Sequence, residues 1–120
     1  LTFIVIVIGT LVTGSGPHAG DWQAPRLQLD HRAISWLHAD AVIALLCVTL
    51  ALFVLSEISP ETKKRIKFFF VATLVQGLIG YIQYIQGLPE LLVAAHLVGS
   101  TLVWITTWRI WLSITTAEGK

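Results

Sequence analysis

Residues 34–55 read ISWLHADAVIALLCVTLALFVL, and this stretch decides the fold class. Asp40 is its only residue with a full charge at pH 7, and no charge follows between Ala41 and Leu55. A helix that crosses a bilayer needs roughly 20 consecutive, mostly apolar residues, and this stretch is long enough. Backbone groups find no water partner in lipid, so such a segment must be helical. The stretch therefore predicts a transmembrane helix.

Three other apolar segments have the same character: Leu1 to about Thr13, about Ile66 to Gln86, and about Pro89 to Ile114. Over the whole chain, 55% of the residues are hydrophobic and 12% are charged, and the mean hydropathy is +0.76. Soluble domains usually carry about twice that charged fraction. We therefore expect one all-α integral membrane domain, a bundle of four transmembrane helices over residues 1–120. The net charge of +1 gives no reason to expect a nucleic-acid partner.

The first apolar segment is short for a membrane span. Leu1 already lies within the apolar run, the run ends near Thr13, and the chain contains no Met. A span needs roughly 20 residues. We expect the first helix to be truncated and the chain to be a piece of a longer polypeptide.

The connections between the segments differ in composition. Gly14–Ala33 is long, rich in Gly, Pro and Asp, and carries two of the four histidines. Ser56–Lys67 is short and basic, and Gly87–Pro89 is a tight turn. Lys and Arg collect on the cytoplasmic side of membrane proteins. The basic loop at residues 63–67 and the C-terminus are therefore predicted to be cytoplasmic, and the other two connections to lie outside.

His38 and His96 are the two histidines within predicted spans, and polar residues inside a membrane are costly and usually functional. At 1.5 Å per residue, both lie within ~10 Å of the outer end of their helices. Two imidazoles at one level, on parallel helices, suit ligation of a heme iron from both sides in a bundle core. Hydrogen bonding between helices is the alternative, and spacing alone does not separate the two. Zinc usually takes three or four ligands, which His18 and His31 would have to complete from the long connection.

Four further polar residues are secondary candidates. Gln76 and Gln83 share one face of the third helix with Gly80. Packing between helices is the ordinary role of such a face, and contact with heme propionates or a quinone-like donor is the functional one. Asp40 points away from the histidine of its own helix; it could pair with Arg32 or a neighbouring subunit of a homo-oligomer, or deliver protons. Arg32 is either a solvated loop charge or a ligand for a heme propionate.

Three parts of the sequence resemble one protein family. They are GTLVTGSGPHAGD at residues 9–21, LHAD at residues 37–40, and QGLIGYIQYIQGLPE at residues 76–90, continuing to His96 and the pair Gly99–Ser100. Together they resemble the C-terminal half of bacterial heme A synthases, especially the actinobacterial type. The resemblance covers nearly the whole chain, and its most specific part runs from Gln76 to Ser100.

The resemblance implies an eight-helix oxidoreductase of the bacterial plasma membrane, built from two similar four-helix halves. Enzymes of the family oxidise a methyl group of heme O to the formyl group of heme A, which serves terminal oxidases. The N-terminal half of the same enzyme would hold the substrate heme O, and the C-terminal half a heme b cofactor. His38 and His96 fall on the C-terminal histidine pair, the ligands of the heme iron. The implied partners are the N-terminal half, heme O, membrane lipid and an electron donor.

The sequence departs from the catalytic pattern of the family. The N-terminal half of the family carries Glu-x-x-His-Arg, whose Glu is taken as catalytic. In this chain Ser35 precedes His38 by three residues and Ala39 follows it. Gln28 stands three residues before the His31–Arg32 pair, and the cysteine pair found in an outer loop of many relatives is missing. We therefore expect no catalytic residue in this half.

Two other functions stay open from the sequence. The first is a free-standing b-type cytochrome that only carries electrons. The second is a heme-free membrane assembly protein, in which the two histidines merely bridge helices. A transporter is less favoured, because no segment has the pattern of a broken helix.

Overall fold

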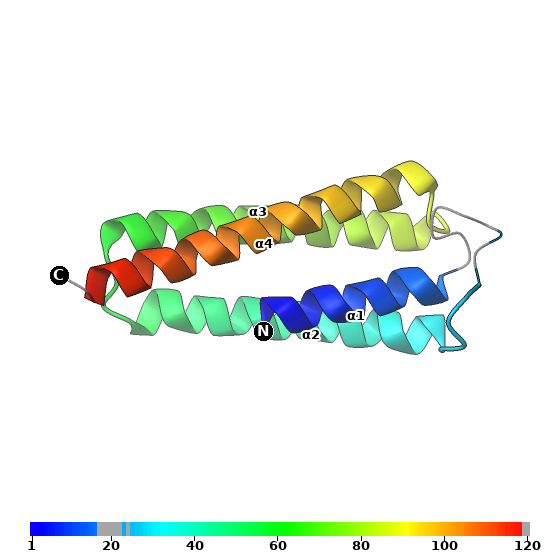
Figure 1. The fold of residues 1–120 in the computed structure, drawn as a ribbon, viewed down its shortest axis with the longest axis horizontal. Coiled ribbons are helices and arrows are strands. Elements are labelled where there is room, and N and C mark those ends of the chain that lie inside the picture. Colours follow the sequence, from blue (N-terminus) through cyan, green and yellow to red (C-terminus); the bar gives the residue numbers. More distant parts are fainter. Residues whose placement is uncertain (17–22, 24, 119–120) are drawn as a thin grey trace.

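The computed structural model describes residues 1–16, 23 and 25–118, and this part of the chain is all-α (Figure 1). Its helices are α1 (Thr2–Ser15), α2 (His31–Leu55), α3 (Pro60–Ile85) and α4 (Glu90–Glu118). The helices α2, α3 and α4 are long and apolar enough to cross a membrane, and α1 is a shorter apolar helix. The predicted fold class, an all-α bundle of a membrane protein, is confirmed.

The second helix begins three residues before the predicted start at Ile34. The Asp30 carboxylate accepts hydrogen bonds from the backbone N–H groups of Arg32 (2.9 Å) and Ala33 (3.1 Å), which caps the helix at His31. The assignment of residues 31–33 to the long connection was therefore wrong. The polar cap, and not the first apolar residue, decides where this helix starts.

The third helix begins at Pro60, six residues before the predicted start at Ile66. Ser59 Oγ accepts a hydrogen bond from the backbone N–H of Thr62 (3.1 Å), and proline suits the first helical turn because its missing N–H needs no partner there. The basic residues 63–67 therefore lie in the first turns of α3, and their assignment to a loop was wrong. Arg65 pairs with Glu61 one turn earlier, at 3.0 Å.

The turn between α3 and α4 is as tight as predicted. Gly87 (φ 75°) and Leu88 (φ 64°) both take the left-handed backbone conformation, which is uncommon for a residue other than glycine. The N–H of Leu88 donates to the carbonyl of Gln83 (2.7 Å) and closes the turn. Pro89 directly precedes α4.

The four helices form two antiparallel pairs, α1 with α2 and α3 with α4 (Figure 1). Contact between the pairs is limited and joins α1 to α4 and α2 to α3. Among these helices, α2 and α4 lie on one diagonal of the bundle and α1 and α3 on the other, without Cα atoms within 8 Å across either diagonal. The bundle measures 54 × 23 × 23 Å. We call the end with residue 31 and the Gly87–Leu88 turn the turn end, and the end with residues 56–67 the basic end.

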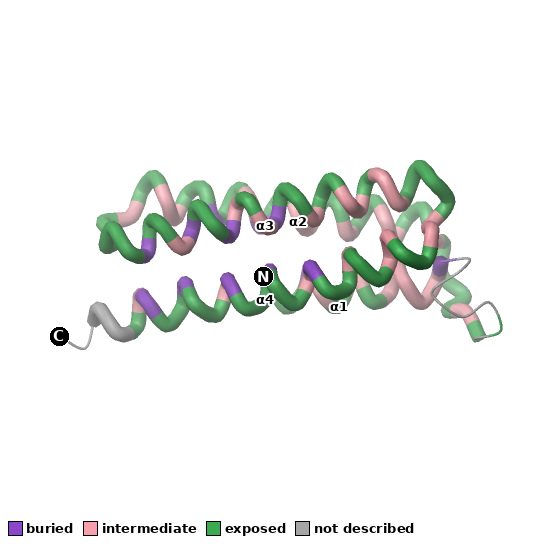
Figure 2. The backbone as a smooth tube through the Cα atoms, turned by 90° about the horizontal axis from the view of Figure 1, so that it is seen from above, coloured by how far each residue is buried: buried purple, intermediate pink, exposed green. Residues whose placement is uncertain are grey.

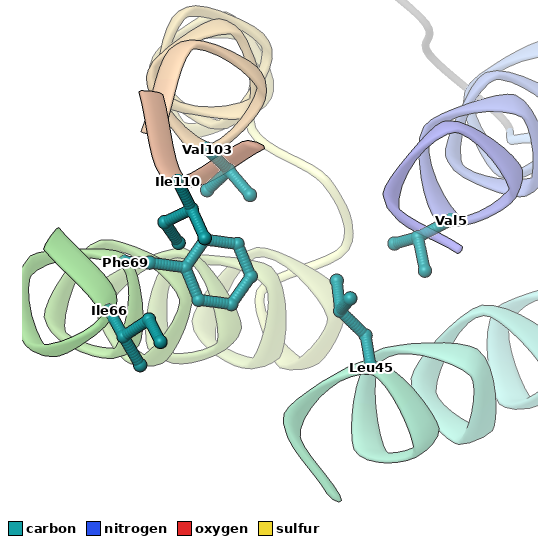
Figure 3. Close-up of a cluster of buried hydrophobic side chains, with 6 residues drawn as sticks. All are labelled: Val5, Leu45, Ile66, Phe69, Val103 and Ile110. Carbon is teal, nitrogen blue, oxygen red and sulfur yellow. The ribbon is translucent and has the colours of Figure 1, made fainter. Parts of the chain in front are cut away.

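The best-packed part of the bundle lies towards the basic end. Phe69 and Ile66 of α3 are fully buried, and they cluster with Val103 and Ile110 of α4 (Figure 3). The hydroxyl of Thr62 donates to Ser113 Oγ across the same helix pair (3.1 Å). Most other large apolar residues are exposed, as expected of a surface that faces lipid, and Figure 2 shows exposed positions along all four helices.

Replacing Phe69 by alanine tests this core. Phe69 is 1% exposed and its neighbour Phe68 is 62% exposed, so the two form a matched pair. We expect Phe69→Ala to lower the free energy of unfolding in detergent by about 3 kcal/mol, because a cavity remains among close-packed side chains. Phe68→Ala should change it by well under half as much. Unfolding of both variants is followed by circular dichroism during denaturation. An equal loss of unfolding free energy in Phe69→Ala and Phe68→Ala would contradict this packing.

Candidate functional site

His38 of α2 is seated against α1. The carbonyl group of Val5 lies beside the imidazole. One helical turn further along α1, Gly9 leaves room for the ring, since a Cβ atom at this position would lie only 3.1 Å from His38 Cε1. A larger residue at Gly9 would therefore have to displace the imidazole. Gly9 therefore stands at the position where the His38 ring approaches the backbone of α1.

His96 of α4 is seated against α3 in the same way. The carbonyl group of Gln76 lies beside the imidazole. A Cβ atom on Gly80, four residues after Gln76, would lie 3.2 Å from His96 Cε1. Each helix pair thus holds one imidazole between a glycine and the carbonyl four residues before that glycine.

The two rings also share their orientation and their environment. A Cβ atom on Gly9 would lie 3.5 Å from Nδ1 and 3.8 Å from Nε2 of His38, and one on Gly80 would lie 3.7 and 3.8 Å from the same atoms of His96. The two imidazoles lie near one another within the bundle. Nδ1 of each ring is buried and has no hydrogen-bond partner within the described part of the chain. Buried polar atoms are normally partnered, so each ring has one nitrogen whose hydrogen bond is not formed within the described residues.

The inner face of α3 adds three more unpartnered oxygen atoms. Gln76 Oε1, Gln83 Oε1 and Thr73 Oγ1 are buried and lack a hydrogen-bond partner in the described structure. The side chain of Gln76 lies directly on Gly99 of α4, so that any side chain at that position would collide with it. Gln76 and Gln83, both predicted as secondary site residues, therefore face the interior on the same stripe as Gly80.

A third histidine belongs to the turn end. His31 is half-buried, its Nδ1 lies 3.3 Å from Ser15 Oγ, and its ring stacks on Tyr84 of α3 with 6.4 Å between centroids. This side chain joins α1, α2 and α3, and its assignment to a loop was wrong. A cavity of about 20 Å³, room for about one water molecule, lies close by. It is lined by Val12, Thr13, Gly16, Gln83, Leu88 and Val93.

The remaining candidates are not gathered at the site. Arg32 and Asp40 are both exposed on α2, and the predicted ion pair between the two is not formed. His18, the fourth histidine, lies outside the described residues. Within the described part of the chain, no three His, Cys, Asp or Glu side chains come together as a metal site. Within the described residues, the site thus contains two imidazoles and no third ligand.

Sequence reasoning missed the residues that contact and position the two imidazole rings. Gly9 interrupts an apolar helix, which is the signal of a close backbone approach, but Val5 contributes only its carbonyl and has no signal in the sequence. Thr73 looks like any small residue of a membrane helix. Comparison of the chain with protein-family models, curated proteins and solved structures finds no match. The geometry of the site therefore carries the functional argument.

Gly80 and Gly77 offer a matched test of the close contact between Gly80 and the His96 ring. Nothing lies within 4 Å of a Cβ atom at Gly77. We expect Gly80→Val to lower the free energy of unfolding by about 1–3 kcal/mol, because the new side chain forces the His96 ring from its place. Gly77→Val should change it little. If denaturation in detergent gives the same loss for both variants, the imidazole is not held against Gly80.

Proposed function

We propose that the chain binds one heme between His38 and His96 and is the heme b-binding half of a heme A synthase. One observation carries the heme proposal. Two imidazoles from diagonal helices each lie against a glycine and a backbone carbonyl, and each keeps a buried, unpartnered Nδ1. A histidine that ligates a metal usually directs its other ring N–H at a carbonyl or carboxylate, which fixes the orientation of the ring. The carbonyls of Val5 and Gln76 are suited to that role.

The available ligands fit a heme better than a bare metal ion. Zinc would require three or four protein ligands, and the described residues supply two. A heme brings the other ligands of its iron on the porphyrin ring, so the two imidazoles would be sufficient to hold it. Small residues and limited contact between the helix pairs favour a flat ligand there. When bound, the heme would supply one-electron redox chemistry.

The chain's own residues would hold and insulate this group. His38 and His96 would ligate the iron as neutral imidazoles, and Gly9 and Gly80 would let both rings approach. Val5, Leu45 and Val103 are buried apolar residues that lie towards the basic end from this site, and they would shield the group from water on that side. Gln83, on the side of the turn end, is available to a polar edge of the ligand.

The wider assignment rests on the resemblance of residues 9–21, 37–40 and 76–100 to the C-terminal half of heme A synthases. In that enzyme, heme O is oxidised at a methyl group, and this half would carry electrons, stabilise the bundle, or both. Asp40, the carboxylate closest in sequence to either histidine, is exposed. The catalytic glutamate is accordingly proposed to belong to the N-terminal half. Partners would be that half, heme O, membrane lipid and an electron donor, and no catalytic residue is assigned to this chain.

The proposed membrane is the bacterial plasma membrane, with the turn end outside and the basic end in the cytoplasm. Support comes from Lys63, Lys64 and Lys67, which are exposed in the first turns of α3. Arg65 also lies there and donates to the carbonyl of Arg109 (2.7 Å). Basic residues next to a span collect on the cytoplasmic side.

The reduced-minus-oxidised absorption spectrum of the purified chain tests the heme proposal. We expect the bands of a low-spin b-type heme, because two imidazoles would be strong-field ligands of the iron. His38→Ala and His96→Ala should each abolish the low-spin spectrum or convert it to a high-spin one. His31→Ala is the control, since His31 is half-buried at the turn end and is not a proposed ligand.

Absence of heme from the wild-type protein, purified together with any upstream half, would overturn the proposal and leave a heme-free membrane bundle. A low-spin spectrum that survives both alanine variants would also contradict it. A b-type spectrum from a protein without a catalytic half would instead indicate a free-standing cytochrome.

Cysteine labelling tests the proposed orientation. Cys47 is the only cysteine, so Cys47→Ala gives a cysteine-free background. In that background, Gln28→Cys at the turn end should react with a membrane-impermeant maleimide on intact cells. Lys64→Cys should react only after the cells are opened, because both positions are exposed but lie at opposite ends. The reverse pattern would refute the orientation.

A further inference from the structure

Arg65, in the first turns of α3, is held by contacts to two helices. Its Nε donates to the Glu61 carboxylate one turn earlier (3.0 Å), and its Nη1 donates to the carbonyl of Arg109 on α4 (2.7 Å). The Arg65 side chain is still 28% exposed. A guanidinium presents its N–H donors in a rigid, planar fork. Arg65 is therefore fixed in position while part of its side chain stays accessible to a ligand.

Two other cations lie at the same place. Lys64 and Arg109 are exposed, and both lie near the Glu61 carboxylate that accepts the hydrogen bond of Arg65. The start of α3 lies beside the end of α4 (Figure 1), which brings these residues together across the helix pair. We call Lys64, Arg65 and Arg109 the basic cluster. Its three cations share one carboxylate, so positive charge is in surplus among these four residues.

The basic cluster lies at the depth of lipid headgroups. The candidate membrane spans of α3 and α4 are Pro60–Ile85 and Glu90–Thr115. Arg65 and Arg109 each lie within two helical turns of the end of their span, which is ~10 Å or less. Long basic side chains near the end of a span extend to the headgroup region while their aliphatic parts stay in the apolar layer. The phosphate groups of the membrane are therefore within reach of this cluster.

Exposed apolar side chains continue the same flank towards the middle of the membrane. Phe68 follows Lys64 by four residues on α3, and Ile105 precedes Arg109 by four residues on α4. Residues four apart share a helix face, and the two helices are antiparallel, so both apolar residues lie one turn deeper than the cluster. Phe68 is 62% exposed and Ile105 is 50% exposed. Cations followed by an apolar surface match a phospholipid, whose acyl chains continue from its phosphate.

We propose that the basic cluster binds the phosphate of an anionic membrane phospholipid, with an acyl chain along Phe68 and Ile105. Guanidinium groups match the geometry of phosphate oxygens, and basic sites between membrane helices bind anionic headgroups. The surplus of positive charge favours a headgroup with net negative charge, because the choline of a zwitterionic lipid would face the same cations. The histidine site lies towards the opposite end of the bundle, so the lipid would bind whether or not that site holds a heme.

Native mass spectrometry of the purified chain in detergent measures this binding. Phosphatidylglycerol and phosphatidylcholine with the same dioleoyl chains are titrated separately, and the dissociation constant of the first bound lipid is determined for each. The measured quantity is the ratio of the phosphatidylcholine constant to the phosphatidylglycerol constant. The shared acyl chains largely cancel from this ratio, so it reports the headgroup. An ionic strength near 0.15 M limits electrostatic interactions to about 8 Å.

We expect a ratio well above one in the wild type and a fall of about fivefold in Arg65→Gln and in Arg109→Gln, since each variant removes one cation beside the headgroup. Arg65→Lys keeps the charge and should lose less than Arg65→Gln. Lys63→Gln is the matched control. It removes the same charge from the same helical turn, but residues two apart on a helix point to nearly opposite sides. Its ratio should stay within twofold of the wild type.

Equal dissociation constants of the two lipids in the wild type would overturn the inference, and so would an unchanged ratio in both glutamine variants of the arginines. An equal fall in Lys63→Gln would also overturn it, because net charge alone would then explain the preference. Glycerophosphoglycerol, the same headgroup without acyl chains, distinguishes a soluble phosphate from a lipid. If it binds as tightly as phosphatidylglycerol, the cluster is a site for a soluble phosphate and the lipid assignment is wrong.

Discussion

A polar group inside a membrane-spanning bundle must be satisfied by the protein or by what the protein binds, because hydrocarbon offers it no partner. This constraint divides the bundle into two parts. Towards the basic end, the hydroxyls of Thr62 and Ser113 bond to each other, and Ile66 and Phe69 are fully buried between helices. Towards the turn end lie the buried polar atoms that lack a partner among the described residues: His38 Nδ1, His96 Nδ1, Gln83 Oε1, Gln76 Oε1 and Thr73 Oγ1, the last near mid-length of α3. The first part closes the bundle, and the second holds polar atoms for which the described residues supply no partner.

The two helix pairs contribute equivalent halves of this site. In α1 and α2, the parts are Gly9 and His38, and in α3 and α4 they are Gly80 and His96. Each pair can position its own imidazole, because the glycine and the carbonyl that hold the ring lie on the partner helix of the same pair. The pairs themselves touch only weakly. A ligand bound by both imidazoles would therefore add a connection between the pairs that the protein side chains provide sparingly.

The sequence was sufficient for the fold class, because long apolar stretches in lipid have few alternatives to a helix. It was less reliable at the helix ends. Asp30 and Ser59 cap α2 and α3 before their apolar runs begin, so the helices start earlier than hydropathy indicates. Counting residues from the helix ends placed His38 and His96 at a similar depth in the membrane. Their ligation of a heme iron stays a prediction. The groups that contact the two rings could not be predicted. Whether the Val5 carbonyl lies beside His38, or the Thr73 hydroxyl lacks a partner, depends on how two helices pack together.

Asp40 shows that the surface of this bundle is not uniform. It is exposed on α2, one turn after Trp36, on a helix long enough to cross the membrane. A charge inside a membrane span usually faces water, a cavity or another protein segment, since contact with hydrocarbon is unfavourable. Arg32 does not serve as its partner. Within the proposed enzyme, the N-terminal half is the segment that would cover this side of α2. The carboxylate would then mark the contact between the two halves, while the opposite side of the same helix carries the imidazole to the site.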